Sequence, residues 1–179
     1  MNLIETFQNL VAQVPELVQP LIVALAGAVP FIEGEGAASI GIIGGINPVV
    51  AAIAGIVGNF ACVAILVLAS SGARQAIVNR ARVRQSVASD GSIIDESVVS
   101  ADSGRTAARR EKFQRAFTRY GVPGVSLLGP LLLPTQFTAA ALTSTGVSPL
   151  RVLAWQAAAI ALWTTVITLI LTGVLRAVA

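Results

Sequence analysis

Histidine is absent from this chain of 179 residues, and cysteine occurs once, at Cys62. A single cysteine excludes an internal disulfide, and the lack of histidine argues against a zinc site. We therefore expect no metal and no cofactor. Because no nucleophile motif is present either, we do not expect an enzyme. Aromatic residues make up only 5% of the chain, so the formal net charge of +3 does not indicate nucleic-acid binding.

Charged residues are also scarce, at 12%, whereas a typical soluble domain has about 25%. Hydrophobic residues reach 55%, and the mean hydropathy is +0.79. One small core cannot hide that much apolar surface, so we expect an integral protein of the cell membrane. The first ten residues have neither a basic region nor a long apolar run, so we expect no cleavable signal.

The basic residues are concentrated in one segment. Ten of the 12 lie between Arg74 and Arg119, and the positive-inside rule places this segment in the cytoplasm. Its middle is rich in Ser, Asp and Gly, which favours a flexible linker; an ordered cytoplasmic turn is the alternative. We therefore predict a first membrane half over 1–73, a cytoplasmic segment over 74–119 and a second membrane half over 120–179.

Two stretches have the pattern of amphipathic helices. Apolar residues recur at helical spacing over residues 3–18, where Pro15 would bend or end the helix. Phe113, Phe117 and Tyr120 share a helical face opposite several basic residues. We expect both helices to lie at the membrane interface, the second on anionic lipid; plain helix packing is the alternative for the second.

An internal repeat is visible in the apolar parts. Gly45-Ile46-Asn47-Pro48 matches Gly146-Val147-Ser148-Pro149 about one hundred residues later. A long apolar span follows each match, and a shorter broken apolar segment precedes it. The spans are 48–71 and 149–176, and the broken segments are 21–46 and 122–147. Each span is long enough to cross a hydrocarbon core of ~30 Å.

The charges give the two halves opposite orientations. The first span ends in the cytoplasm at Arg74, and Arg151 indicates that the second span begins there. Each broken segment must then return to the side it entered from. We predict an all-α integral membrane fold: an inverted repeat of interfacial helix, re-entrant hairpin and transmembrane helix. Four ordinary kinked spans are the alternative. The expected bends are at Pro30, Gly34, Gly36, Pro123, Gly129, Pro130 and Pro134.

Glu33 and Glu35 are the only charged residues between Glu16 and Arg74. A carboxylate at membrane depth costs about 2.5–3.5 kcal/mol on insertion scales, so such a group usually binds a proton, a cation or a charged substrate. Two carboxylates this close cannot both ionise cheaply in a low dielectric, so one is expected to carry a proton. A solvated turn outside the bilayer is the alternative.

Several neutral polar residues are candidates for the same site. At the offset of the repeat, Glu35 aligns with Gln136. Gln136, Thr135 and Thr138 in the second hairpin could donate hydrogen bonds, or only satisfy freed backbone groups at the break. Asn59 on the first span is a further polar candidate, for which an ordinary interhelical hydrogen bond is the alternative.

Residues 32–38 (Ile-Glu-Gly-Glu-Gly-Ala-Ala), followed by Gly41, Pro48 and Gly58-Asn59, resemble the small multidrug export family. So does Arg119-Tyr120-Gly121 leading into Gly129-Pro130-Leu131-Leu132-Leu133-Pro134-Thr135-Gln136. The resemblance covers roughly Leu21 to Leu175 without the linker. It extends distantly to the DedA/VTT membrane proteins, which share a pair of inverted re-entrant hairpins.

The resemblance implies that Glu33, which matches the family's glutamate, carries the proton, with Glu35 tuning it or binding substrate. Two departures weaken an arginine-based phosphate site. The family often has arginine where Glu35 stands, and the DedA arginine of the second hairpin has no counterpart over 122–147.

The leading functional prediction is a small transporter that exports a hydrophobic or cationic small molecule in exchange for protons. A DedA-like lipid flippase or scramblase and a non-transporting scaffold are the alternatives. The expected partners are membrane lipids, the substrate, protons and a second copy of the chain, without nucleic acid.

Overall fold

The computed structural model describes residues 2–87 and 121–178. Every regular element in these two ranges is a helix, so the predicted all-helical fold is confirmed for them. The elements are α1 (Leu3–Gln13), α2 (Gln19–Gly27), α3 (Glu33–Ile43), α4 (Pro48–Val87), the 3₁₀ helix η1 (Gly129–Leu131), α6 (Thr135–Ser144) and α7 (Pro149–Val178). Residues 121–128 are helical as well.

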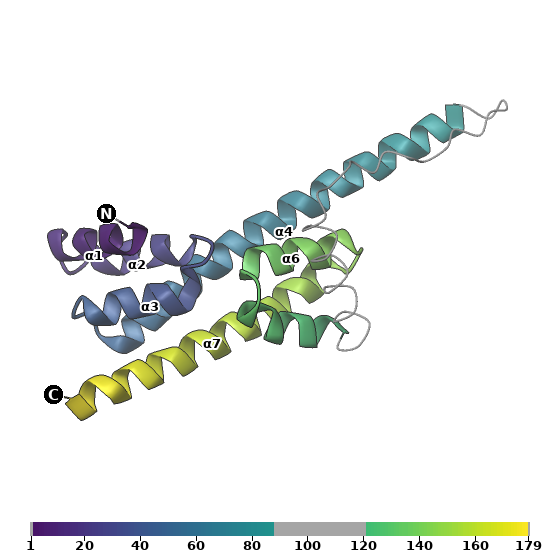
Figure 1. Cartoon of the computed structure of the whole chain (residues 1–179). Coiled ribbons are helices and arrows are strands. Elements are labelled where there is room, and N and C mark those ends of the chain that lie inside the picture. The colour runs from purple at the N-terminus through teal and green to yellow at the C-terminus, as the bar shows by residue number, and fades with distance from the viewer. Residues whose placement is uncertain (1, 88–120, 179) are drawn as a thin grey trace.

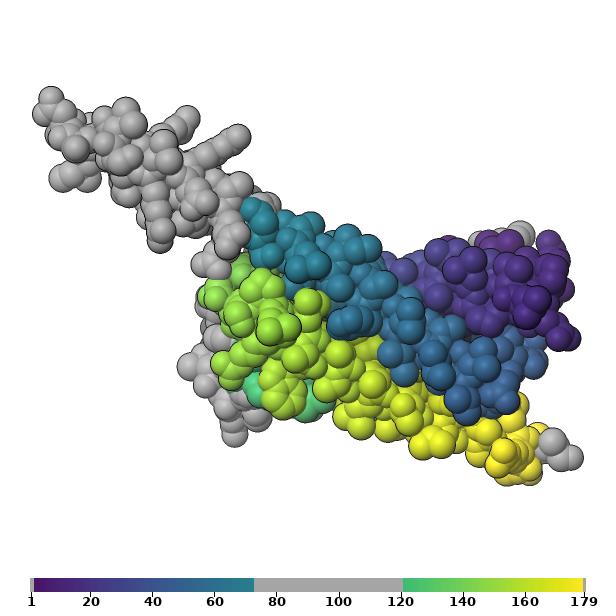
Figure 2. Space-filling model, turned by 180° about the vertical axis from the view of Figure 1, so that it is seen from behind, coloured from purple at the N-terminus to yellow at the C-terminus, as the bar shows by residue number. Residues whose placement is uncertain are grey.

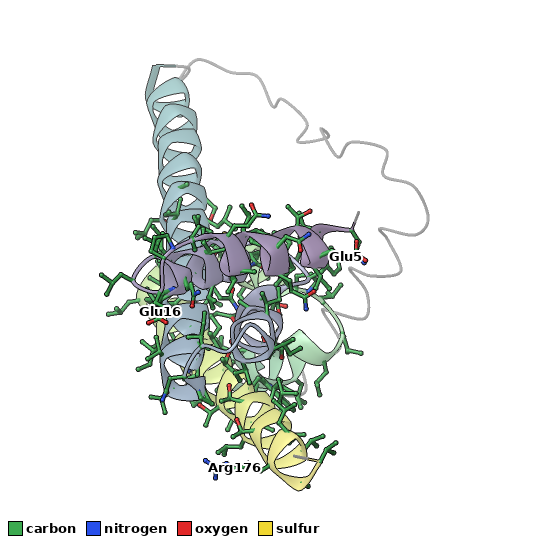
Figure 3. All side chains as sticks on the ribbon, turned by 90° about the vertical axis from the view of Figure 1, so that its left-hand side faces the viewer. Glu5, Glu16 and Arg176 are labelled. Atoms are coloured by element: carbon green, nitrogen blue, oxygen red, sulfur yellow. The ribbon has the colours of Figure 1, made fainter. Side chains whose placement is uncertain are left out.

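Helix α1 begins at a capping box. The Asn2 side chain accepts the Glu5 backbone N–H at 2.9 Å, and the Glu5 carboxylate accepts the Asn2 backbone N–H at 3.1 Å. The helix ends at Gln13, just before Pro15, which cannot sit inside a helix without cost. It runs across the α2–α3 pair (Figure 1 and Figure 3). Its position at a membrane interface stays a prediction.

The apolar stretch over 21–46 forms two short helices, α2 and α3, and the chain reverses between them (Figure 1). At 1.5 Å per residue they measure about 14 and about 17 Å, so neither alone reaches the ~30 Å of a hydrocarbon core. Pro30 lies in the break, as predicted. The expectation that Gly34 and Gly36 also break the chain is wrong, because both lie inside α3.

The second half repeats this order. A helix over 121–128 leads into η1, which contains Pro130, and the chain is irregular just before Pro134, the N-cap of α6. Pro123, expected to bend the chain, instead lies within the helix. Helix α6 then turns into α7.

The turns before α4 and α7 have the same local geometry. Gly45 has φ 87° and Gly146 has φ 89°, a left-handed conformation that favours glycine. Gly45 donates its N–H to the Ile42 carbonyl and Gly146 donates to the Thr143 carbonyl, each at 3.1 Å. Helices α4 and α7 pack side by side and run in opposite directions (Figure 1 and Figure 2).

Helix α4 is longer than the predicted span. Its apolar part covers Pro48–Gly72, but the helix continues to Val87, into the segment predicted as a linker. This continuation extends beyond the rest of the molecule (Figure 1). The remainder of the predicted linker and the predicted interfacial helix around 113–120 lie outside the described residues.

Close packing of the first half depends on glycine. Helices α2 and α4 approach so closely that a Cβ at Gly58 would lie 1.8 Å from the Ala24 carbonyl oxygen. No side chain fits there without moving a backbone.

Two helices, α4 over Pro48–Gly72 and α7, are long and apolar enough to cross a membrane. Large hydrophobic side chains point outward along both of them. Examples are Ile53, Val57, Ile65, Leu68, Leu162, Leu169, Ile170 and Val174. Most of the apolar surface of both helices is therefore exposed in the isolated chain.

Candidate functional site

The two hairpin breaks meet at Glu33 and Thr135. Glu33 is the first residue of α3, and Thr135 is the first residue of α6. Oε1 of the Glu33 carboxylate accepts hydrogen bonds from both the backbone N–H and the hydroxyl of Thr135. Glu33 is 8% exposed and Thr135 is 1% exposed, so this contact is buried.

Through this contact, Glu33 from the first half of the chain caps the N-terminus of α6 in the second half. Helix α6 has Pro134 at its N-cap, and this residue makes no side-chain capping bond. The Glu33 carboxylate binds one of the free N–H groups that a capping side chain would satisfy. A negative charge is also favourable there, because the partial positive charges at the starts of α3 and α6 both lie close to it.

Asn59 of α4 and Gln136 of α6 extend the contact into a network. Asn59 donates from Nδ2 to the Thr135 hydroxyl at 3.3 Å. Gln136 donates from Nε2 to the Asn59 Oδ1 at 3.2 Å. Because the Thr135 hydroxyl donates onward to Glu33, each donor in this chain points toward the carboxylate. A chain oriented this way stabilises the ionised carboxylate.

Four of the six predicted site residues are therefore brought together: Glu33, Thr135, Gln136 and Asn59. Glu35 is half-buried, and no hydrogen bond joins its carboxylate to another described residue. Thr138 is buried, but its hydroxyl donates to the Pro134 carbonyl at 3.3 Å. The repeat aligns Glu35 with Gln136 in sequence. In the structure, however, it is Glu33 that makes the contact between the two halves of the chain, and its partner is Thr135.

No basic side chain is seen beside this carboxylate in the described part of the chain. Arg151 and Arg176, the two basic residues whose side chains are described, are both exposed. The partners of Glu33 are neutral donors and helix ends. A proton or a cation can therefore bind this carboxylate without displacing either of the two basic side chains that the structure describes.

An aromatic pair flanks the buried contact. The rings of Phe31 and Phe137 lie 6.3 Å apart at an angle of 55°, and the side chains are 80% and 54% exposed. Each is two residues from a member of the Glu33–Thr135 contact. Phe31 has φ 71° and Glu33 has φ 55°, both in the left-handed region that a residue with a Cβ rarely adopts. The strained break thus buries the carboxylate and leaves the ring outside.

Of a set of buried polar side chains, the sequence analysis found only Gln136. Their oxygen or nitrogen atoms have no hydrogen-bond partner within the described residues. They are Ser126 Oγ, Gln136 Oε1, both amide atoms of Gln156, Thr164 Oγ1 and Thr168 Oγ1. The signal that could have found three of them is their spacing, since Gln156, Thr164 and Thr168 are separated by multiples of four along an apolar helix.

Within the described ranges, no three His, Cys, Asp or Glu side chains lie close enough together to hold a metal ion. The site is therefore described by its single buried carboxylate and neutral hydrogen-bond donors.

Comparison of the chain with protein-family models, with curated proteins and with solved structures gave no match. The resemblance to the small multidrug export family stays a prediction from the motifs. What fold and site define is a class: a helical protein with two helices long and apolar enough to cross a membrane, in which two pairs of short helices meet at a buried carboxylate.

Proposed function

We propose that the chain is a small integral membrane transporter that exchanges protons for a hydrophobic cation. In this proposal α4 and α7 cross the membrane in opposite directions, and the two pairs of short helices are re-entrant hairpins. The short lengths of α2 and α3 and the outward apolar faces of α4 and α7 support this arrangement. The basic segment that begins at Arg74 then lies in the cytoplasm.

The buried contact between Glu33 and the start of α6 is the observation that carries the proposal. Paired half-helices that point their N-termini at a midplane site recur in secondary transporters. In this chain the negative charge at the helix N-termini is the carboxylate of Glu33 and not a group of the substrate. When a proton binds, Glu33 becomes neutral; when the proton leaves, the carboxylate can pair with a cationic substrate. Competition between proton and cation for one carboxylate gives exchange with a simple physical basis.

The aromatic pair supports a hydrophobic cation over a bare inorganic ion. A cation over an aromatic face gains about 0.5–2 kcal/mol, depending on how far the site is desolvated. Phe31 and Phe137 offer two such faces, each two residues along the chain from a member of the Glu33–Thr135 contact. An organic cation would place its apolar body on the rings and its charge toward Glu33. A dissolved alkali ion has no apolar body to place on the exposed rings, so it could gain only the attraction of its charge to a ring face.

A lipid flippase is the second candidate, favoured by the exposed Phe31 and by Leu132, which is 84% exposed at the second break. An apolar tail could reach the site from the bilayer along these side chains. Among the described side chains no buried arginine or lysine is available for a phosphate headgroup. This favours the organic cation as substrate.

The test is proton flux in proteoliposomes, followed with a pH-sensitive dye trapped inside. Wild type is compared with Glu33→Gln and with Glu35→Gln, its matched control. Glutamine keeps an oxygen that can accept the Thr135 hydrogen bonds but cannot carry a proton. We expect tetraphenylphosphonium to drive proton movement in wild type, Glu33→Gln to abolish it, and Glu35→Gln to reduce it by no more than about threefold, since Glu35 lies outside the network.

Three outcomes are informative. If Glu33→Gln still exchanges protons for the cation, Glu33 is not the carrier. If the cation drives no proton movement in wild type while labelled phospholipid crosses the bilayer, the flippase reading replaces the exchanger. If neither substrate moves, the proposal of a transporter is contradicted, and a scaffold role is left.

A further inference from the structure

Polar side chains recur every fourth residue along the C-terminal half of α7. Thr164 is 0% exposed and Thr168 is 8% exposed, and neither hydroxyl has a hydrogen-bond partner within the described residues. Thr172 follows one turn later and is half-buried; its hydroxyl donates to the Thr168 carbonyl at 2.7 Å, and its oxygen can still accept a hydrogen bond. The exposed Arg176 lies one turn after that. These residues form a row on a helix that is otherwise largely apolar. Below, the α7 row means Thr164, Thr168 and Thr172.

Other buried threonines show what a hydroxyl usually does in a helix. Thr138 donates to the Pro134 carbonyl at 3.3 Å, and Thr143 donates to the Ala139 carbonyl at 2.8 Å. Both satisfy themselves within their own helix. Thr164 and Thr168 do not, although each has a carbonyl four residues earlier. Buried hydroxyls without a protein partner normally bind water, because leaving them unpaired costs about 1–3 kcal/mol.

The row starts beside Gly34, the residue that follows the buried Glu33. A Cβ built on Gly34, the residue after Glu33, would lie only 2.4 Å from Thr164 Oγ1. At 1.5 Å per residue, Thr168 is about 6 Å further along α7, Thr172 about 12 Å and Arg176 about 18 Å. Half of a ~30 Å hydrocarbon core is about 15 Å, so the row and Arg176 together cover the distance from a midplane site to the membrane surface.

In the other direction the row is interrupted. Ile160, which is 1% exposed, lies between Thr164 and Gln156. The next polar side chain of α7 at this spacing of four is therefore Gln156, about 12 Å from Thr164 along the helix axis and too far for a direct hydrogen bond. The two halves of α7 thus differ: only the half toward the C-terminus has a polar group at every fourth residue.

We propose that the α7 row holds a chain of hydrogen-bonded water molecules that conducts protons between the C-terminal end of α7 and Glu33. This inference rests on the proposed function, because it supplies the coupling proton of that exchanger. A proton entering from bulk water passes from water to water and binds the Glu33 carboxylate, which becomes a neutral carboxyl. Release runs the same way in reverse. The threonine hydroxyls hold and orient the waters and keep their own protons.

The experiment measures protonation of Glu33 itself, so it does not depend on transport. A rapid pH change is applied to the purified protein in lipid, and the infrared carbonyl band of a protonated carboxyl is followed in time. The band is assigned to Glu33 by its loss in Glu33→Gln. The variants Thr164→Val and Thr168→Val replace a hydroxyl with a methyl group. Thr164→Ser keeps the hydroxyl and removes the methyl group.

The matched control is Thr143→Val, since Thr143 is also buried but satisfied within its own helix. We expect Thr164→Val and Thr168→Val to slow Glu33 protonation at least about tenfold. Thr164→Ser should keep most of the wild-type rate, and the rate of Thr143→Val should stay within about twofold of wild type.

Wild-type protonation rates in both valine variants would overturn the proposal, and increased thermal stability in the same variants would then show that the hydroxyls bind nothing. Transport and route can fail separately. If no cation is exchanged but the valine variants slow protonation, the proton route stands and the exchanger fails. If cation exchange depends on Glu33 but the valine variants protonate it at the wild-type rate, the exchanger stands and this route fails.

Discussion

Phe31 and Glu33 both hold a left-handed backbone conformation, which costs a residue with a Cβ roughly 1–2 kcal/mol. Two such residues on either side of Ile32 are unlike an ordinary helix turn. The conformation directs one carboxylate inward to the start of α6 and one ring outward. Strain of this kind persists only where surrounding contacts hold it, and it often marks a functional site. The Glu33–Thr135 hydrogen bonds are the contacts that hold it here.

This strain makes a prediction at the level of single residues. Phe31→Gly should be more stable than Phe137→Gly by about 2 kcal/mol in thermal unfolding in detergent. Both variants lose the same ring pair, so its contribution cancels in the comparison. Glycine relieves the left-handed strain at position 31, whereas at position 137 it costs about 1 kcal/mol as a helix residue. Equal stabilities would show that Phe31 is not strained.

At the scale of elements, the close contact of α2 with α4 makes a second prediction. Gly58→Ala places a Cβ 1.8 Å from the Ala24 carbonyl oxygen, so one helix must move. We expect a loss of about 3 kcal/mol or more, at or above the upper end of the usual range for overpacking. Gly72→Ala is the control on the same helix, since nothing lies within 4 Å of that Cβ. Its stability should stay equal or rise by up to about 1 kcal/mol.

Thermal unfolding of the two alanine variants in one detergent provides the measurement. A Gly58→Ala protein as stable as the Gly72→Ala protein would mean that α2 and α4 do not approach as described. Activity need not be measured, because neither glycine lies in the Glu33 network.

The elements could be predicted where the signal is local. The apolar spacing over residues 3–18 with Pro15 gave α1, and apolar length gave the spans within α4 and α7. Gly34 was misread because a glycine that breaks a helix and one that lets another helix approach look alike in a sequence. Its role depends on Thr164, which is 130 residues away in the chain (164 minus 34).

Part of the candidate site was predictable as well, because the residue types that form it can be recognised in the sequence one by one. Buried polar residue types singled out Glu33, Asn59, Thr135 and Gln136, which the structure brings together. The pairing of Glu33 with Thr135 was not predictable, because the repeat aligns Gln136 with Glu35, whereas the hairpins meet through the first residues of α3 and α6. The α7 row escaped notice because burial and a missing partner are properties of the packed molecule.

At the scale of the whole molecule, both chain ends lie on the same side. The N-terminus and the C-terminus are at one end, and α4 runs toward the other (Figure 1). Glu5, Glu16 and Arg176 are the charged residues labelled near that shared end (Figure 3). In the proposed inverted repeat this end faces out of the cell, because the basic segment after α4 faces in. Four ordinary spans would require the C-terminus to face the cytoplasm.

Labelling with a membrane-impermeant maleimide distinguishes the two arrangements. Cys62 is the only cysteine, so Cys62→Ala gives a background into which single cysteines can be placed. Leu17→Cys and Val178→Cys suit the test, since these side chains are 95% and 83% exposed. We expect both to react in intact cells, whereas Ser89→Cys in the basic segment should react only after the cells are opened.

If Val178→Cys also needs opened cells, α7 and α4 do not cross the membrane in opposite directions, and the proposal that the second hairpin is re-entrant is wrong as well. Because the proposed proton route ends at the C-terminal end of α7, the same result would move its entrance to the cytoplasmic side and reverse the gradient that could drive export.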